Sequence, residues 1–446
     1  MKQLIKPQRA VRYSILIMAW LAILACNNNK TQHISSVNNN PEPIGWYAGD
    51  IHTHRSCNSS LAISDTSLLT RMGVNDLAVI SLLSDMGNSQ APDRVADLQK
   101  VDGNDSPLSG NGKIIHYAAE WHWDANDFEK PHQALGGHLV LLGIKKAYKI
   151  WDESAYKILE WAKPQKAVCG FAHMQYLDNN MPNTLSCCIP VEFPVEAILG
   201  TIDFVSEDCA GGDVAINAWY KLLNCGIKMG LAAGTDYPCN GGDPYGTLLT
   251  YVNIKDNKLT YQNWIDGIKN GHTVVSRNCH NEFLNLSVNN KFTCGDEVHI
   301  SNPQTFNINV EWTAKIRLTG RVEVVCNGNV IAKQEGTAKP GEPIILKATQ
   351  EFTKSGWLCA RRMDKNGHQT HTAPVYVIVN NAPVRASADD AMYFVQWIDN
   401  LIAKTSPGQD WNKYFTHDLD VVQGRYKQAR EMYLKVAEEA DLHATH

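Results

Sequence analysis

Short apolar runs alternate with amphipathic or loop segments along residues 45–280. The runs are too short for helices and predict strands, whereas several intervening segments repeat apolar residues at helical spacing. Candidate strands are residues 77–83, 113–119, 138–143, 167–172 and 227–233, and candidate helices are residues 67–75, 154–162 and 214–225. Because alternating strands and helices are typical of α/β layers, we predict an α/β barrel-like domain over residues 45–280.

The pattern changes near residue 281. Phe306, Ile308, Val310 and Trp312 alternate with polar residues, which indicates strands with one buried face. The dipeptide Asn327-Gly328 lies between two such runs and predicts a hairpin. We therefore expect a small β-sandwich over residues 281–382.

Helical spacing returns at the end of the chain. It is carried by large apolar residues in two stretches separated by Pro407-Gly408, namely Phe394, Trp397, Ile398 and Leu401, then Tyr426, Ala429, Met432, Tyr433 and Val436. This spacing predicts two helices whose apolar stripes pack on the other domains. Residues 383–446 are thus expected to form a helical tail.

The first 26 residues have the composition of an export signal. Lys2, Lys6, Arg9 and Arg12 precede the apolar segment 13–25, which is short for a membrane span. The segment closes on Ile23-Leu24-Ala25-Cys26, which resembles a bacterial lipobox. That resemblance implies that cleavage leaves Cys26 as a lipid-carrying terminus; the alternative is an ordinary secretory signal with an incidental cysteine. Residues 27–44 are rich in Asn, Ser and Pro and predict a flexible tether.

Composition and charge limit which kinds of molecule the protein is expected to bind. The chain of 446 residues carries a net charge of −5, and no basic run follows the signal, which argues against nucleic acid. Eleven of the 12 cysteines remain after Cys26 is set aside, and no Cys-x-x-Cys pair is present. An oxidising compartment allows disulfides, which the sequence cannot pair, and buried free thiols are equally plausible for Cys169 and Cys225. The expected location is a bacterial cell envelope, with the protein facing the periplasm or cell surface.

Side chains that bind metals stand at or near the ends of the apolar runs. They are His52, His54, Glu120, His138, His173 and Asp236. Residues two apart in a strand point to one side, so His52 and His54 can bind one ion together. A His-x-His pair alone is weak evidence in a chain with 16 histidines. Ligands gathered at one end of many strands are nevertheless typical of metal sites at a barrel rim.

Five motifs in order resemble a known family. They are Gly-Asp-Ile-His-Thr-His at 49–54, Gly-His-Leu-Val-Leu-Leu-Gly at 137–143, Gly-Phe-Ala-His at 170–173, Leu-Leu-Asn-Cys-Gly-Ile at 222–227 and Ala-Gly-Thr-Asp at 233–236. Together they resemble the PHP (polymerase and histidinol phosphatase) superfamily of metal-dependent hydrolases, and most of all its CehA/McbA-type members. The resemblance implies a distorted (β/α)7 barrel followed by the sandwich and the helical tail.

The resemblance also implies a metal site. The first ion would take His52, His54, Glu120 and Asp236, and the second would share Glu120 and add His138 and His173. A third ion normally needs three further histidines, but those positions hold Ser60, Met86 and Pro238. We therefore expect two divalent ions, and this mixture of imidazole and carboxylate ligands suits Zn, Mn or Fe.

The expected activity is hydrolysis of a small-molecule phosphoester, ester or carbamate by a hydroxide that bridges the two metals. Glu120 and Asp236 would serve the reaction as ligands, and His122 could protonate the leaving group or be an idle histidine of a rim loop. Asp50 could orient a ligand histidine or cap a turn, and Arg55 could bind an anionic substrate or make a surface salt bridge. The alternative function is a non-catalytic binding lipoprotein on a degenerate barrel.

Overall fold

The computed structural model describes residues 40–57, 62–87, 95–123, 137–150, 153–174, 182, 188–208, 213–239, 246–256, 258–414 and 418–444. The predicted signal peptide, Cys26 and most of the predicted tether lie outside these residues, as does the side chain of His122. Residues 40–446 belong to one structural unit, which is the unit discussed below. No helix among the described residues is both long enough and apolar enough to span a bilayer.

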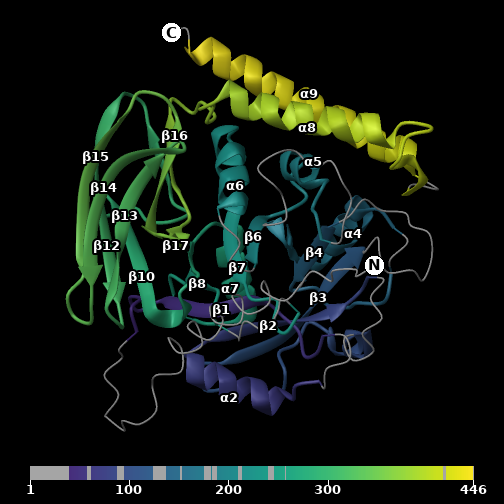
Figure 1. The fold of residues 1–446 in the computed structure, drawn as a ribbon, viewed down its shortest axis with the longest axis horizontal. Helices are drawn as coiled ribbons and strands as arrows, with labels where there is room; N and C mark the ends of the chain where they lie inside the picture. The colour runs from purple at the N-terminus through teal and green to yellow at the C-terminus, as the bar shows by residue number, and fades with distance from the viewer. Residues whose placement is uncertain are drawn as a thin grey trace, which may run out of the picture. The chain divides into compact units, whose positions relative to one another are not determined.

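A large mixed β-sheet forms the framework of residues 45–280 (Figure 1). Its strands run in the order β9-β8-β1-β2-β3-β4-β5-β6-β7. The pairs β1/β2, β2/β3, β5/β6 and β6/β7 are parallel, and β8/β9, β1/β8, β3/β4 and β4/β5 are antiparallel. Their bounds are β1 Trp46–Thr53, β2 Val79–Asp85, β3 Ile114–Trp123, β4 Gly137–Leu142, β5 Val168–Phe171, β6 Phe204–Asp208, β7 Gly230–Gly234, β8 Leu249–Asn253 and β9 Thr273–Ser276.

The predicted α/β class is confirmed, but the described strands do not show a closed (β/α)7 ladder. The sheet is mixed because β4, β8 and β9 run antiparallel to their neighbours, and it continues from β9 into the second module. It nevertheless curls so that β7 returns to β1. His54 N donates to Tyr237 O at 2.7 Å, and Asp236 N donates to His52 O at 2.7 Å. Gly234 permits this approach, since a Cβ there would lie 2.6 Å from the Cβ of His52.

One apolar cluster fills the inside of the curled sheet. Strands β1 to β8 all contribute to it, and helix α7 (Tyr261–Lys269) adds Trp264, Ile265 and Ile268. The Thr260 hydroxyl accepts from Asn263 N at the start of this helix. The other helices of this region are α2 (Asp65–Asn75), α4 (Ala155–Ala162), α5 (Phe193–Ile198) and α6 (Val214–Asn224).

The second module contains two facing β-sheets, as the alternating pattern predicts. One is antiparallel and consists of β10 (Glu282–Val288), β12 (Gln304–Ala314) and β15 (Ile344–Phe352). The other holds β11 (Glu297–Ile300), β13 (Leu318–Cys326), β14 (Asn329–Ala338), β16 (Gly356–Asp364), β17 (Gly367–Thr372) and β18 (Val375–Val379). Asn327 and Gly328 both have positive φ, at 48° and 83°, which the predicted hairpin turn requires.

A buried charge cluster joins this module to the first sheet where β17 pairs with β9. Glu207 on β6 pairs with Arg277, and its Oε1 lies 2.7 Å from His368 Nε2. Asp213 Oδ1 lies 2.5 Å from His368 Nδ1. Burial by itself raises the pKa of Glu207. Arg277 and His368 lower it by a larger amount, so the pKa falls from its ordinary 4.5 to about 2. The cluster therefore stays ionised and fixes β6 against the second module.

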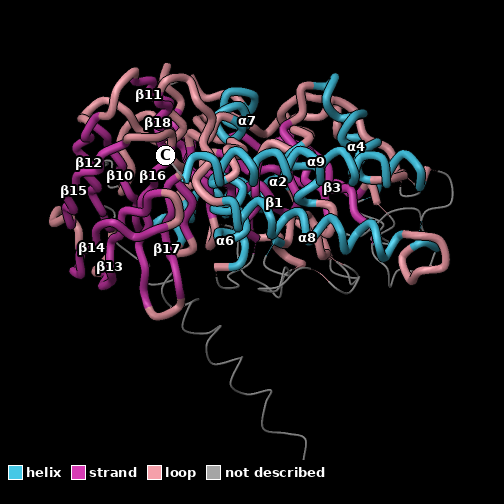
Figure 2. Tube along the Cα trace, turned by 90° about the horizontal axis from the view of Figure 1, so that it is seen from above, coloured by secondary structure: helices cyan, strands magenta, loops and turns pink. Residues whose placement is uncertain are grey.

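Helices α8 (Ala388–Thr405) and α9 (Leu419–Ala444) form the end of the chain and lie side by side (Figure 2). Phe394 and Tyr433 pack between them with ring centroids 4.9 Å apart and ring planes tilted by 32°. Trp397 Nε1 donates to Val191 O at 2.9 Å, and Tyr433 Oη donates to Pro194 O at 2.9 Å. The aromatic stripes thus pack on the first domain as expected, while the exact domain boundaries stay predictions.

Candidate metal centre

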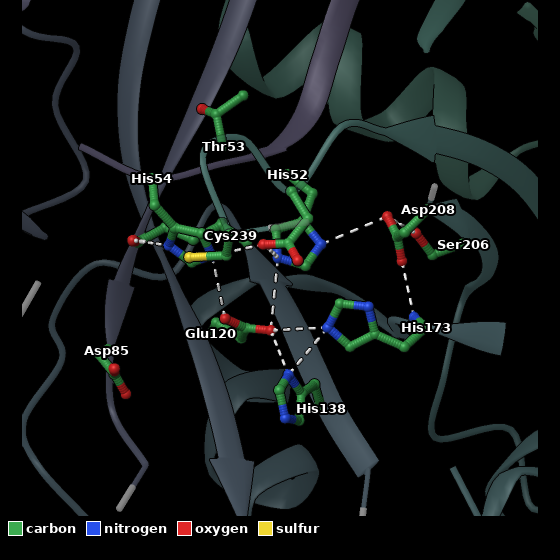
Figure 3. Close-up of polar contacts among 12 residues, drawn as sticks. His52, Thr53, His54, Asp85, Glu120, His138, His173, Ser206, Asp208 and Cys239 are labelled. Carbon is green, nitrogen blue, oxygen red and sulfur yellow. Dashed lines mark hydrogen bonds and ion pairs between the residues drawn. The ribbon is translucent and has the colours of Figure 1, made fainter. Parts of the chain in front are cut away.

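His52 and His54 lie at the end of β1, where the strand is irregular. The register against β2 slips by one residue between Asp50 and Thr53, as at a β-bulge or a similar irregularity. Bulges redirect side chains, and both imidazoles here point toward Glu120 (Figure 3). His54 Nδ1 lies 2.9 Å from the carbonyl oxygen of Leu83. A carbonyl only accepts, so His54 Nδ1 donates to it and Nε2 is the nitrogen that faces the carboxylates.

Glu120 and Asp236 each lie close to both His52 and His54. His54 Nε2 lies 3.2 Å from Glu120 Oε2 and 3.2 Å from Asp236 Oδ1. His52 Nε2 lies 3.4 Å from Glu120 Oε1 and 3.4 Å from Asp236 Oδ1, and it makes no hydrogen bond with any described residue. Two ligands about 2.1 Å from a tetrahedral ion lie about 3.4 Å apart. The predicted first group therefore has the spacing of a metal site.

The other two predicted ligands also face Glu120. His138 Nδ1 is 2.8 Å from Glu120 Oε1, and His173 Nε2 is 3.8 Å from the same oxygen. The two imidazole nitrogens are 3.0 Å apart. Glu120 thus contacts both groups, with Oε2 toward His54 and Oε1 toward His52, His138 and His173 (Figure 3). All six predicted side chains meet in one buried cluster that could hold metal ions.

The electrostatics keep the carboxylates ionised. Burial by itself raises the pKa of the Glu120 carboxyl. His138 and His52 lower it by a larger amount, so the pKa lies well below its ordinary value. The pKa of Asp236 is lowered because His52, His54 and His173 outweigh its burial. Burial lowers the pKa of His52, but the carboxylates of Glu120 and Asp236 raise it well above its ordinary value. Two buried carboxylates facing several imidazoles are a donor set that attracts a divalent cation.

Asp208 is a site residue that the sequence interpretation missed. It lies at the end of β6 and is fully buried. Its Oδ1 is 3.3 Å from His52 Nδ1 and accepts from the Ser206 hydroxyl at 2.8 Å. Its Oδ2 accepts from the backbone N–H of His173 at 2.8 Å, a residue with a positive φ of 58°. Asp208 therefore orients one ligand ring and holds the strained backbone of another.

We expect Asp208→Asn to weaken metal binding by about 10- to 100-fold while the protein remains folded. The amide removes the charge behind His52 but keeps an oxygen that can accept from His173. The matched control is Asp203→Asn, a carboxylate on the segment entering the same strand that pairs with Lys269 at 2.9 Å. Competition with a chromophoric chelator measures the affinities. Equal affinity in the Asp208 variant and the wild type would remove the orienting role.

Other candidates of the sequence interpretation have different partners. Asp50 Oδ1 accepts from His52 N at 3.1 Å and from Thr235 N at 3.0 Å, so it ties β1 to the end of β7, and it orients no imidazole among the described residues. Arg55 Nη1 pairs with Asp97 Oδ1 at 3.2 Å, which is the salt-bridge alternative. His122 lies opposite His138 in the β3/β4 register, and its side chain is outside the described residues.

Cysteine pairing could not be predicted from the sequence, and the structure shows part of it. Cys57 and Cys239 are disulfide-bonded, and Cys188 and Cys279 are also in disulfides. Sulfur of Cys188 lies near His138 and His173, and sulfur of Cys239 near His54 and Asp236. A disulfide sulfur is not a thiolate, so neither is a metal ligand in this state. Five described cysteines are free and buried, which agrees with the expectation for two of them: Cys169, Cys225, Cys294, Cys326 and Cys359.

No family model matches this chain, and no curated protein matches it. Among solved structures, similar chains include a CARDB domain from Pyrococcus furiosus, with 18% identity and a TM-score of 0.16 over 22% of this chain and 95% of that chain. The same domain in complex with di-metal ions gives equal values over 96% of its length. Endonuclease Q, solved with a 27-mer duplex carrying an abasic lesion, has 11% identity and a TM-score of 0.31 over 50% of this chain and 56% of that chain.

Proposed function

We propose that the protein is a binuclear metal-dependent hydrolase on a distorted (β/α)7 PHP-type barrel, similar to CehA/McbA-type enzymes. The position of Glu120 is the observation that carries the proposal. One oxygen of its carboxylate faces His54, and the other faces His52, His138 and His173. A buried carboxylate between two imidazole groups suits a ligand shared by two neighbouring cations. His52 and Asp236 complete the first group, at 3.4 Å from each other.

The residues of the chain would prepare the site before substrate binds. Two divalent cations, when bound, would supply a water of lowered pKa and a Lewis acid for a carbonyl or phosphoryl oxygen. Glu120 and Asp236 remain ionised because the facing imidazoles lower their pKa values. The Leu83 carbonyl fixes the tautomer of His54, and Asp208 orients His52. His122 is the proposed proton donor to the leaving group.

The proposed substrate is a small molecule with a phosphoester, ester or carbamate bond, and nucleic acid is not the proposed partner. The proposed location is the cell envelope of a bacterium, where a lipid on Cys26 would anchor the protein to a membrane. The sequence pattern of residues 1–26 supports this location.

Metal analysis together with a substrate screen tests the proposal. The protein is treated with a mild chelator, refilled with Zn, Mn or Fe, and assayed on aryl phosphates, esters and carbamates. We expect about two equivalents of one metal per chain and hydrolysis of at least one substrate class that disappears on chelation and returns on refilling. A protein that binds no metal and is equally stable after chelation would instead be the binding lipoprotein.

A further inference from the structure

The Cys57–Cys239 disulfide lies at the edge of the metal cluster. Cys57 follows His54 by three residues, and Cys239 follows Asp236 by three residues. The bond thus joins the two loops that leave the ligand-bearing ends of β1 and β7. Cys239 Sγ lies within 4.8 Å of donor atoms of both His54 and Asp236 (Figure 3). A nitrogen and a sulfur on one tetrahedral zinc lie about 3.6 Å apart, so a small movement would make Cys239 a ligand.

The loop that carries Cys239 is held in place without the disulfide. Cys239 N donates to Asp236 O at 2.7 Å, which closes the turn after the ligand. Tyr237 O accepts from His54 N at 2.7 Å, and Tyr237 forms a parallel bridge with Thr53. The sulfur would therefore stay beside His54 and Asp236 after the bond is broken.

This disulfide is also reachable by reductants. Cys57 and Cys239 are only half-buried, whereas the five described free cysteines are buried. Exchange requires that a thiolate reach a disulfide sulfur, so exposure favours attack here. The chain thus combines a half-buried disulfide with a metal-binding cluster next to one of its sulfurs.

We propose that the Cys57–Cys239 disulfide is a redox switch on the first metal site and that Cys239 is its latent ligand, an inference that rests on the proposed binuclear centre. A dithiol would reduce the bond, donating two electrons and two protons and becoming a disulfide itself. Cys57 and Cys239 become thiols, and Cys239 loses its proton to solvent when its sulfur binds the ion beside His54 and Asp236. The reduced protein then holds the first ion more tightly and leaves it less open to substrate.

Two single variants separate the proposed ligand role of Cys239 from the cross-linking role of the disulfide. Cys57→Ser and Cys239→Ser both lack the disulfide, but only Cys57→Ser keeps the sulfur of Cys239 beside His54 and Asp236. Both full-length proteins are loaded with Co(II), and their near-ultraviolet absorption is compared with that of oxidised wild type and of wild type reduced with a phosphine and desalted. Thermal unfolding of each apo-protein controls for the lost cross-link.

We expect a sulfur-to-cobalt charge-transfer band in Cys57→Ser and in reduced wild type, and none in Cys239→Ser or oxidised wild type. Chelator competition should show about tenfold tighter binding of one cobalt in Cys57→Ser than in Cys239→Ser. Equal spectra and affinities in the two variants would show that the disulfide is a structural cross-link only. The proposed binuclear centre would not be affected by that result. Oxidised wild type that binds no cobalt would overturn the proposed function itself.

Discussion

Glu120→Gln is expected to lose both metal ions and to lose hydrolytic activity by at least about 10³-fold against every substrate class that the wild type accepts. Glutamine has nearly the same shape but a neutral amide, which is a poor ligand and cannot balance two cations. The loss should extend to both ions because one carboxylate faces both imidazole groups, with Oε1 2.8 Å from His138 and Oε2 3.2 Å from His54. Losing Asp236, whose Oδ1 lies 3.4 Å from His52 Nε2 and 3.2 Å from His54 Nε2, should remove mainly the first ion.

Metal content by elemental analysis and initial rates on the substrate panel measure this result. The control is Glu335→Gln, which changes an exposed carboxylate on β14 that pairs with Arg321 across the hairpin. It should retain two ions and full activity. If Glu120→Gln kept both ions, or stayed fully active, the shared-ligand role of Glu120 would be wrong and the proposed mechanism with it.

Local sequence patterns predicted the elements better than their connections. Expected helices at 67–75, 154–162 and 214–225 correspond to α2, α4 and α6, and expected strands at 138–143 and 167–172 correspond to β4 and β5. The antiparallel direction of β4 was not predictable, because strand direction depends on the path of residues 124–136 and not on side-chain periodicity. Helix α7 was missed although Tyr261, Trp264, Ile265 and Ile268 have helical spacing after the capping Thr260.

The candidate ligands were readable because each ends or begins a short apolar run, and strand ends gather at one edge of a sheet. Asp208 lacks this property, since Ser206 and Glu207 separate it from the short apolar pair Phe204-Val205, and it did not stand out. The disulfide partners could not be found, because pairing depends on which loops the folded sheet brings together across 182 residues. The curl of the sheet determines which loops meet, and local sequence patterns do not reveal this curl.

A second large effect concerns stability and originates where α9 packs on α5. Glu192 precedes α5, is buried, and accepts from the Tyr426 hydroxyl at 2.5 Å. The nearby cation, Arg425, forms its salt bridge with Glu196 and not with Glu192, because Arg425 Nη2 lies 2.6 Å from Glu196 Oε2. Burial, and then the charge of Glu196, raise the pKa of Glu192 from its ordinary 4.5 to about 8, although Tyr426 and Arg425 lower it. Asp418 also faces this group and raises its pKa.

This raised pKa predicts a protein that loses stability as the pH rises. The folded state binds the Glu192 proton more tightly than the unfolded state, so the stabilisation is complete below about pH 4.5 and is lost as the pH passes through about 8. Each pH unit in that window costs about 1.4 kcal/mol, or up to about 4 kcal/mol between pH 5 and 8. Glu192→Gln keeps an acceptor for Tyr426 but cannot ionise, so it should match the wild type at pH 5 and exceed its stability at pH 8.

Urea unfolding of the metal-free proteins at pH 5, 6.5 and 8 measures the difference between the two proteins, which cancels the titration of all other groups. Glu431→Gln on the exposed side of α9 is the control and should follow the wild type throughout. A constant difference between Glu192→Gln and the wild type at all three pH values would show that Glu192 is already ionised in the folded protein. Agreement with the expected slope would mean that Glu192 keeps its proton in the folded protein, where Tyr426 of the tail binds it.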